Sequence, residues 1–190
     1  MAQDTVTIVS GLPRSGTSMM MSMLQAGGMP ILADNIREAD VDNPKGYYEF
    51  QRVKQIEQDC SWLEDAKGRA VKMISALLQY LPPGYVYRVI FMQRRIDEIL
   101  ASQRLMLIRR GEPTDSVSDR ELAEVFRKHL RQVGRWLDEQ PNIAVLYVSY
   151  QRVLQDPLGE AKRVNQFLGS ALDVDRMVSA VDTSLYRQRT

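Results

Sequence analysis

The chain has 190 residues, of which 44% are hydrophobic and 26% charged, a balance typical of a globular domain with a sizeable core. A net charge of +1 excludes a bulk electrostatic attraction to nucleic acid or to a membrane surface, so we expect neither as a partner. The single cysteine, Cys60, excludes an intramolecular disulfide and favours a reducing, cytoplasmic compartment.

The sequence also predicts no leader and no membrane span. The first residues lack a basic region followed by an apolar core. No later stretch approaches the ~18 consecutive apolar residues of a spanning helix. We therefore expect residues 1–190 to form a single domain.

The first half of the chain begins with a short apolar strand at residues 6–10. A helix is expected over residues 17–25, because two glycines and a proline follow it. Residues 33–45 mix Asp, Asn and Pro with few apolar residues, which predicts a mostly irregular, exposed segment. Apolar residues at helical spacing predict a helix from Glu49 to Leu63, and a weak strand is possible at residues 30–32.

The second half alternates strands and helices. Strands are predicted at residues 70–74, 87–92 and 142–150, and helices begin after the second and third of these. Gly111 is placed to end the first of these helices, and the pattern Ser-Asp-Arg-Glu from Ser118 is a capping box that opens a long amphipathic one. Asp156 and Pro157 suit the start of a helix ending near Leu168, and a short helix follows from about residue 173. This order predicts an α/β fold: a mainly parallel central sheet flanked by helices, like that of P-loop nucleotide hydrolases.

The segment GLPRSGTS, residues 11–18, has the frame of a phosphate-binding loop. Its glycines permit tight turns, and the amides of residues 14–18 could point at one anion at the start of a helix. Thr17 and Ser18 add hydroxyl groups, while Arg14 adds a positive charge. Thr17, however, stands where ATP-binding loops carry a lysine. The loop therefore predicts an anion site of a different kind.

A second anion site is predicted after the strand at residues 87–92. That strand ends in Gln93-Arg94-Arg95, whereas enzymes that hydrolyse ATP or GTP need an acidic residue near such a strand end to help hold Mg²⁺. Because parallel strands bind ligands at their carboxyl ends, the two cationic sites indicate a ligand with two separate anionic groups and no metal.

These motifs resemble those of sulfotransferases that use 3′-phosphoadenosine 5′-phosphosulfate (PAPS). In that family the loop carries a lysine or arginine at the position of Arg14 and binds the phosphosulfate, which here implies residues Arg14, Ser15, Gly16, Thr17 and Ser18. An arginine and, eight residues later, a serine bind the 3′-phosphate, which implies Arg94 and Ser102. A tyrosine lies beside the adenine, which implies Tyr150, in a segment that runs through Asp-Pro to Phe-Leu-Gly at residues 167–169. The resemblance implies sulfuryl transfer from PAPS to a hydroxyl or amine of a small-molecule or carbohydrate acceptor.

The chain departs from the cytosolic branch of that family. That branch has a histidine just after a Lys-Thr pair, whereas this chain reads Lys72-Met73-Ile74-Ser75, and the C-terminal arginine–lysine–glycine motif is absent. The resemblance is therefore to the bacterial or carbohydrate-directed branch. The tail could supply Arg187 or Arg189 in place of that motif.

Glu49 is the candidate catalytic base, because bacterial and carbohydrate-directed members use a glutamate from this region. Its alternative role is to favour a helix start through the helix dipole. The only histidine, His129, is expected to be a packing or surface-edge residue. Asp40 and Asp42 are weaker candidates for the base, Lys45 or Lys72 could contact the sulfate, and the tyrosines at 47, 48, 80 and 85 could line an acceptor pocket.

Two other functions remain open. A P-loop kinase or NTPase would bind ATP with Mg²⁺, which the missing lysine and acidic residue argue against. A nucleotide-binding protein without turnover would fit the missing histidine motif. The acceptor has no recognisable signature, and we expect its specificity to lie in residues 33–48 and 105–117.

Overall fold

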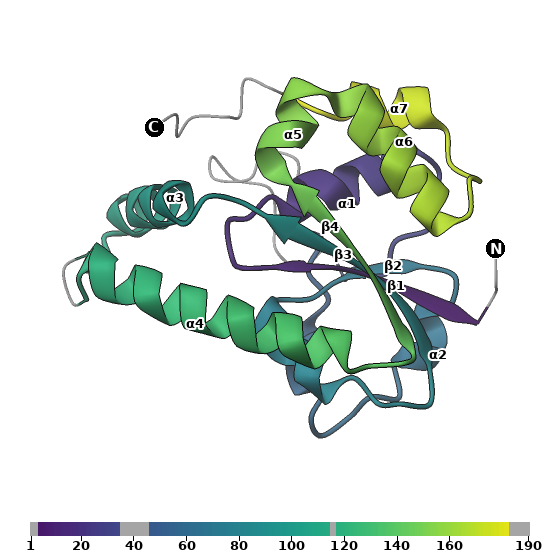
Figure 1. The fold of residues 1–190 in the computed structure, drawn as a ribbon, viewed down its shortest axis with the longest axis horizontal. Helices are drawn as coiled ribbons and strands as arrows, with labels where there is room; N and C mark the ends of the chain where they lie inside the picture. Colours follow the sequence, from purple (N-terminus) through teal and green to yellow (C-terminus); the bar gives the residue numbers. More distant parts are fainter. Residues whose placement is uncertain (1–3, 35–45, 115–116, 183–190) are drawn as a thin grey trace.

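The computed structural model describes residues 4–34, 46–114 and 117–182. At their centre is a four-stranded sheet with helices on both faces (Figure 1). Its strands are β1 (Thr5–Gly11), β2 (Ala70–Lys72), β3 (Val86–Gln93) and β4 (Ile143–Ser149). They are ordered β2-β1-β3-β4, and every neighbouring pair is parallel. All four carboxyl ends therefore lie along one edge, and the predicted α/β fold with a parallel sheet is confirmed.

Two hydrophobic clusters, one on each face, hold this sheet. Successive side chains of a strand point to opposite faces, so Ile8 belongs to one cluster and Val9 to the other. Both are 0% exposed, which explains why β1 is an almost continuous apolar run.

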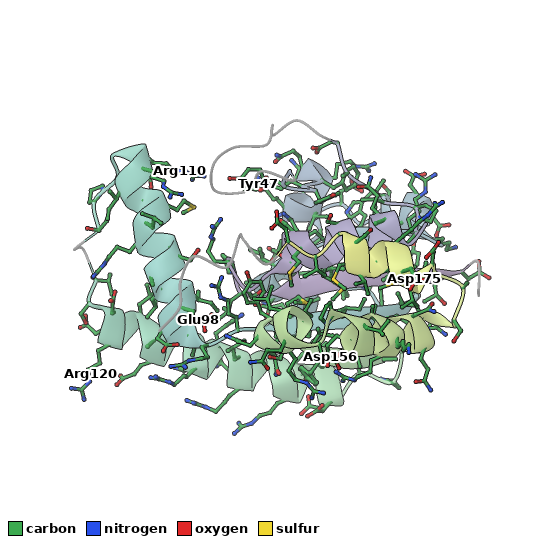
Figure 2. The ribbon with its side chains drawn as sticks, turned by 90° about the horizontal axis from the view of Figure 1, so that it is seen from above. Tyr47, Glu98, Arg110, Arg120, Asp156 and Asp175 are labelled. Carbon is green, nitrogen blue, oxygen red and sulfur yellow. The ribbon has the colours of Figure 1, made fainter. Side chains whose placement is uncertain are left out.

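The helices divide between the two faces (Figure 1). α1, α6 and α7 cover the face of Val9, together with the short α5, while α2, α4 and the 3₁₀ turn η2 cover the face of Ile8. α3 projects from the carboxyl edge, with Glu98 at its base and Arg110 at its far end (Figure 2). The bounds are α1 Thr17–Ala26, η1 Gln51–Gln55, α2 Leu63–Ala66, η2 Ser75–Tyr80, α3 Ile96–Arg110, α4 Asp119–Asp138, α5 Tyr150–Gln155, α6 Pro157–Leu168 and α7 Val174–Ser179.

The predicted helix ends are confirmed where local chemistry determines them. The Ser118 hydroxyl accepts from the Glu121 amide and the Glu121 side chain accepts from the Ser118 amide, which completes the capping box of α4. Gly111 ends α3 in a left-handed conformation, at φ 68°. The Asp156 side chain accepts from the Gly159 amide at the start of α6.

The helix predicted from Glu49 to Leu63 is wrong. Only η1 and the four-residue α2 form in this region. The Asp34 carboxylate accepts from the Gln51 amide at 2.6 Å, and Asp59 accepts from the amide and hydroxyl of Ser61. These side chains compete with the backbone bonds of a continuous helix and break it into turns.

The strands predicted on the β2 side of the sheet are shorter in the structure. Residues 30–32 contribute one bridge, Ile31 to Ala70, and the strand expected over residues 70–74 ends at Lys72. Ser75 then begins η2. Within the described part of the chain, no helix has the length and apolar character needed to cross a bilayer.

Candidate functional site

The loop of residues 11–18 joins the carboxyl end of β1 to the start of α1. A turn closes it, with the Ser15 amide donating to the Leu12 carbonyl at 3.1 Å. Arg14 and Gly16 both take left-handed backbone conformations, at φ 70° and 100°. A left-handed arginine is strained, and such strain concentrates at functional sites. Because the first amides of a helix have no acceptor within it, the start of α1 suits an anion.

Tyr150 lies directly against this loop. A Cβ added to Gly16 would stand 2.5 Å from Cδ2 of the Tyr150 ring and 3.1 Å from Cε2. Tyr150 was expected at the end of a strand, but it is the first residue of α5, and its side chain is 7% exposed. Tyr150 therefore packs against the predicted phosphate loop, although it follows Gly16 by 134 positions in the sequence.

Arg14, Arg94 and Ser102 meet at the carboxyl edge of the sheet. The Arg14 Nε donates to the Ser102 hydroxyl at 3.0 Å. Arg94 Nη1 donates to the Arg14 carbonyl at 3.1 Å. The loop, the end of β3 and the second turn of α3 thus converge, and two guanidinium groups occupy one small region.

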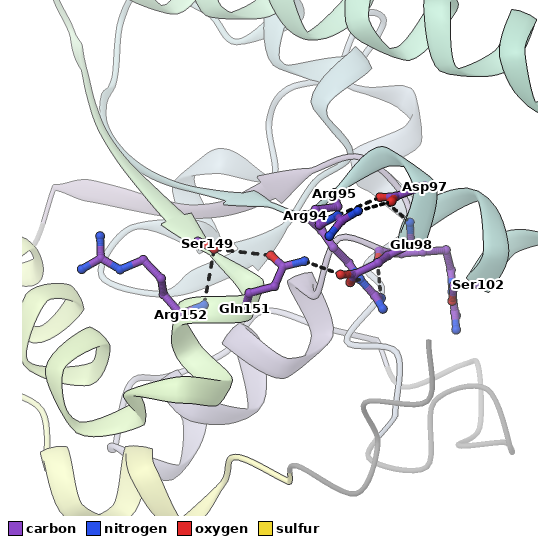
Figure 3. Close-up of polar contacts among 9 residues, drawn as sticks. Arg94, Arg95, Asp97, Glu98, Ser102, Ser149, Gln151 and Arg152 are labelled. Atoms are coloured by element: carbon purple, nitrogen blue, oxygen red, sulfur yellow. Dashed lines mark hydrogen bonds and ion pairs between the residues drawn. The ribbon is translucent and has the colours of Figure 1, made fainter. Parts of the chain in front are cut away.

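Arg94 is held by Glu98, which the sequence analysis did not identify, and by the ring of Tyr150, which it did. Its Nε donates to Oε2 of Glu98 at 2.9 Å, and its guanidinium carbon lies 4.4 Å from the centre of the Tyr150 ring. Glu98 also accepts from Nε2 of Gln151 at 2.8 Å (Figure 3). The spacing of four residues between Arg94 and Glu98 is a signal that could have found this pair. Nothing local indicates Gln151.

Lys72 approaches the loop from the neighbouring strand. At the end of β2, its Nζ lies 3.4 Å from the Ser18 hydroxyl and also contacts the Tyr47 carbonyl. Tyr48 follows in a left-handed conformation, at φ 52°, and its hydroxyl donates to Gln25 of α1. Of the two lysines considered for the sulfate, Lys72 therefore lies beside the loop, whereas Lys45 is outside the described residues.

Glu49 lies in the segment that Lys72 ties to the loop. It stands two residues after Tyr47, is half-buried, and its carbonyl accepts from the Asp34 amide at 3.0 Å. Its backbone is therefore anchored near the carboxyl edge of the sheet. The other acidic candidates, Asp40 and Asp42, lie outside the described residues.

His129 is a packing residue of α4, as predicted. Its Nε2 is 2.8 Å from the Ser75 hydroxyl, and Ser75 is 2% exposed. Burial lowers the pKa of the imidazole below its ordinary value. This contact joins α4 to the turn that follows β2.

The four candidate tyrosines are divided by the structure. Tyr47 lies beside the loop through the contact of its carbonyl with Lys72, whereas the Tyr48 hydroxyl donates to Gln25 in the last turn of α1. Tyr85 instead precedes β3, at the opposite edge of the sheet, where its hydroxyl donates to Glu64. Tyr80 ends η2. Arg187 and Arg189 lie outside the described residues.

Comparisons with known proteins place these features in a wider context. The family model described as "Sulfotransferase domain" matches residues 4–188. No curated protein matches the chain.

Three solved structures share the fold. The sulfotransferase domain of the olefin synthase of Synechococcus PCC 7002 is 17% identical with a TM-score of 0.56, and the match covers 98% of this chain and 88% of that one. A sulfotransferase domain from the curacin biosynthetic pathway is 13% identical with a TM-score of 0.52, covering 96% and 89%. The mouse sulfotransferase SULT7A1, complexed with PAP, is 16% identical with a TM-score of 0.60, covering 100% and 69%.

Proposed function

The chain belongs to the sulfotransferase domain family and is accordingly a sulfuryl-transfer enzyme, and we propose which of its residues hold the donor and the reacting groups. In this proposal PAPS places its phosphosulfate on residues 14–18, its 3′-phosphate on Arg94 and Ser102, and its adenine beside Tyr150. The observation that carries it is the direct contact of Arg14 with Ser102 and Arg94.

This contact matches the charge distribution of PAPS. The donor has two anionic ends, a 5′-phosphosulfate and a 3′-phosphate, on one ribose. The loop at the start of α1 provides one anion site, and Arg94 with Ser102 provides another next to it. Arg14 lies between the two, where its positive charge acts on both. The mouse relative was solved with PAP, the product that such a donor leaves, which supports the assignment.

The reaction needs a base, stabilisation of the transferring group and neutralisation of the leaving phosphate. A new bond forms between the acceptor oxygen or nitrogen and sulfur while the bond from sulfur to the 5′-phosphate oxygen breaks, releasing PAP. Arg14 and the loop amides stabilise charge on the transferring and leaving oxygens. Lys72, next to Ser18, adds a positive charge on the side of β2.

Glu49 is the proposed base that takes the acceptor proton. The support for this role is its position two residues from Tyr47, whose carbonyl contacts Lys72 beside the loop. The acceptor would then enter from the side of this segment. We propose a small molecule or carbohydrate with a hydroxyl or amine group. The described part of the predicted specificity region comprises residues 33–34, 46–48, 105–114 and 117.

Calorimetry with adenosine 3′,5′-bisphosphate tests the donor site. The chain should bind it without Mg²⁺, and Arg94→Ala should weaken binding by about 10- to 100-fold, the effect of losing a charge-assisted hydrogen bond. Arg120→Ala removes the same charge from the far helix α4, where the Arg120 side chain is 90% exposed, and should leave binding unchanged. Binding of ATP with Mg²⁺ but not of the bisphosphate would refute the assignment.

Sulfate transfer from labelled PAPS to a panel of phenols, alcohols, amines and sugars tests the base. Glu49→Gln should lower kcat by about 10²- to 10⁴-fold, the usual contribution of a general base, with bisphosphate binding unchanged. Glu57→Gln is the control, because Glu57 is exposed in the same region. A wild-type chain that binds the bisphosphate but sulfates no acceptor would instead support a nucleotide-binding role without turnover.

A further inference from the structure

We infer that Glu98 is a positioning residue that orients Arg94 and thereby determines how strongly the chain prefers nucleotides with a 3′-phosphate. The inference rests on the proposed donor site. Glu98 would assist the binding of a ligand that is negatively charged, as it is itself, because it orients the arginine that binds the 3′-phosphate.

Burial is the first observation. The side chain of Arg94 is 8% exposed and that of Glu98 is 1% exposed, and they form an ion pair at 2.9 Å. A buried charge is costly unless it is paired and hydrogen-bonded. An apolar residue in place of Glu98 would therefore remove the carboxylate that pairs with the buried Arg94 guanidinium. Glu98 lies in the first turn of α3, where the helix dipole also favours a carboxylate.

Geometry is the second observation. A guanidinium is planar, so a few contacts fix its orientation. The Nε of Arg94 points to Glu98, Nη1 points to the Arg14 carbonyl, and the Tyr150 ring lies 4.4 Å from its central carbon. Glu98 controls the edge of the guanidinium on the side of α3. Without this contact, the Arg94 guanidinium would be oriented less firmly against the Arg14 carbonyl and the Tyr150 ring.

Glu98 is itself fixed by α5 (Figure 3). Its Oε1 accepts from Gln151 at 2.8 Å, and Gln151 in turn accepts from the Ser149 hydroxyl at 3.4 Å. Gln151 follows Tyr150, so two consecutive residues of α5 hold the two proposed subsites: Tyr150 contacts the loop and Arg94, and Gln151 contacts Glu98. The adenine and 3′-phosphate sites are thus joined by Glu98 and Gln151, and a neutral amide makes the link without adding another buried charge.

Whether phosphate binding becomes stronger or weaker distinguishes a positioning role of Glu98 from an effect of its charge alone. Removing a negative charge beside a phosphate site should strengthen phosphate binding if charge were the whole effect. Loss of orientation predicts the opposite. Glu98→Gln keeps the size of the side chain and removes its charge, so it tests the two directly.

The experiment measures the dissociation constants of adenosine 3′,5′-bisphosphate and adenosine 5′-monophosphate for each variant. Their ratio reports the preference for the 3′-phosphate. Glu98→Gln should reduce this preference by about 10-fold or more, with the monophosphate constant changed by less than about 3-fold, because the loop is intact.

Asp97→Asn is the matched control. Asp97 is the neighbouring carboxylate of the same helix turn and is paired with Arg95 at 2.6 Å on the surface, where that partner lowers the pKa of Asp97 and keeps it ionised. Its substitution makes the same charge change and should leave the preference unchanged. Gln151→Leu breaks only the link to α5 and should reduce the preference in the same direction, which covers the case in which Glu98→Gln does not fold.

The outcomes distinguish this inference from the proposed function. If the wild-type chain does not prefer the bisphosphate, the donor assignment and the inference both fail. If the wild-type chain prefers it, and Glu98→Gln or Gln151→Leu retains or increases that preference, only the positioning role is refuted.

Discussion

Gly16→Ala is the substitution whose cost follows most directly from the structure. Gly16 has φ 100°, a conformation that L-residues with a Cβ rarely adopt. The new methyl group would stand 2.5 Å from Cδ2 of Tyr150, so the ring or the loop would have to move by about 1 Å to restore van der Waals contact. Either movement displaces groups of the proposed donor site.

The magnitude has two parts. A left-handed conformation costs an L-residue about 1–2 kcal/mol, and forcing an extra methyl group into a filled space costs about 1–3 kcal/mol. Together they predict a loss of about 2–5 kcal/mol in the free energy of unfolding, a large share of the ~5–15 kcal/mol typical of a domain. Bisphosphate binding should weaken as well, because the strain falls on the loop.

Urea unfolding checks the energy, and a double-mutant cycle checks its cause. Tyr150→Ala removes the ring, so Gly16→Ala should cost less in that background by about 1 kcal/mol or more. Gly134→Ala is the control, since its Cβ would meet nothing within 4 Å inside α4 and should stabilise the helix by about 1 kcal/mol. Fully additive effects of Gly16→Ala and Tyr150→Ala would refute the proposed clash.

Two further predictions concern stability. Burial lowers the pKa of His129 below its ordinary value of 6.5, so the unfolded chain binds the extra proton more readily and the free energy of unfolding should fall as pH drops below that value. His129→Gln should weaken the dependence of the urea midpoint on pH across this range. An unchanged pH dependence would contradict the lowered pKa of His129. Ser118→Ala removes the capping box of α4 and should cost about 1 kcal/mol, whereas Ser118→Thr should retain most of it; equal losses for both would argue against the cap.

Local patterns in the sequence predicted most of the elements. The capping box at Ser118 and the left-handed end at Gly111 depend on residues within one helix turn of each other, so neighbouring letters are sufficient to find them. The apolar run of β1 reflects burial on both faces, which is a property of each residue. The loop of residues 11–18 combines glycines and hydroxyl residues in a fixed order. Its phosphate-loop motif can be recognised because all of its residues are neighbours in the sequence.

The region between Glu49 and Leu63 shows where such patterns fail. Its apolar spacing is helical, yet the Asp34 carboxylate, 17 positions away from Gln51, takes the amide at the start of η1. Periodicity counts apolar residues and gives no weight to a competing side chain from another segment.

The sequence alone therefore predicted most of the elements, the frame of the phosphate loop and the family, because each rests on residues that are near one another or follow a fixed spacing. Only the tertiary structure decided the pairing of Arg14 with Ser102, 88 positions apart, and of Glu98 with Gln151, 53 positions apart. Parallel strands bring their carboxyl ends to one edge, so residues that begin different helices become neighbours there. Which hydrogen-bond donor then pairs with which hydrogen-bond acceptor depends on side-chain directions and burial at that edge. Neither is a property of any single stretch of the chain.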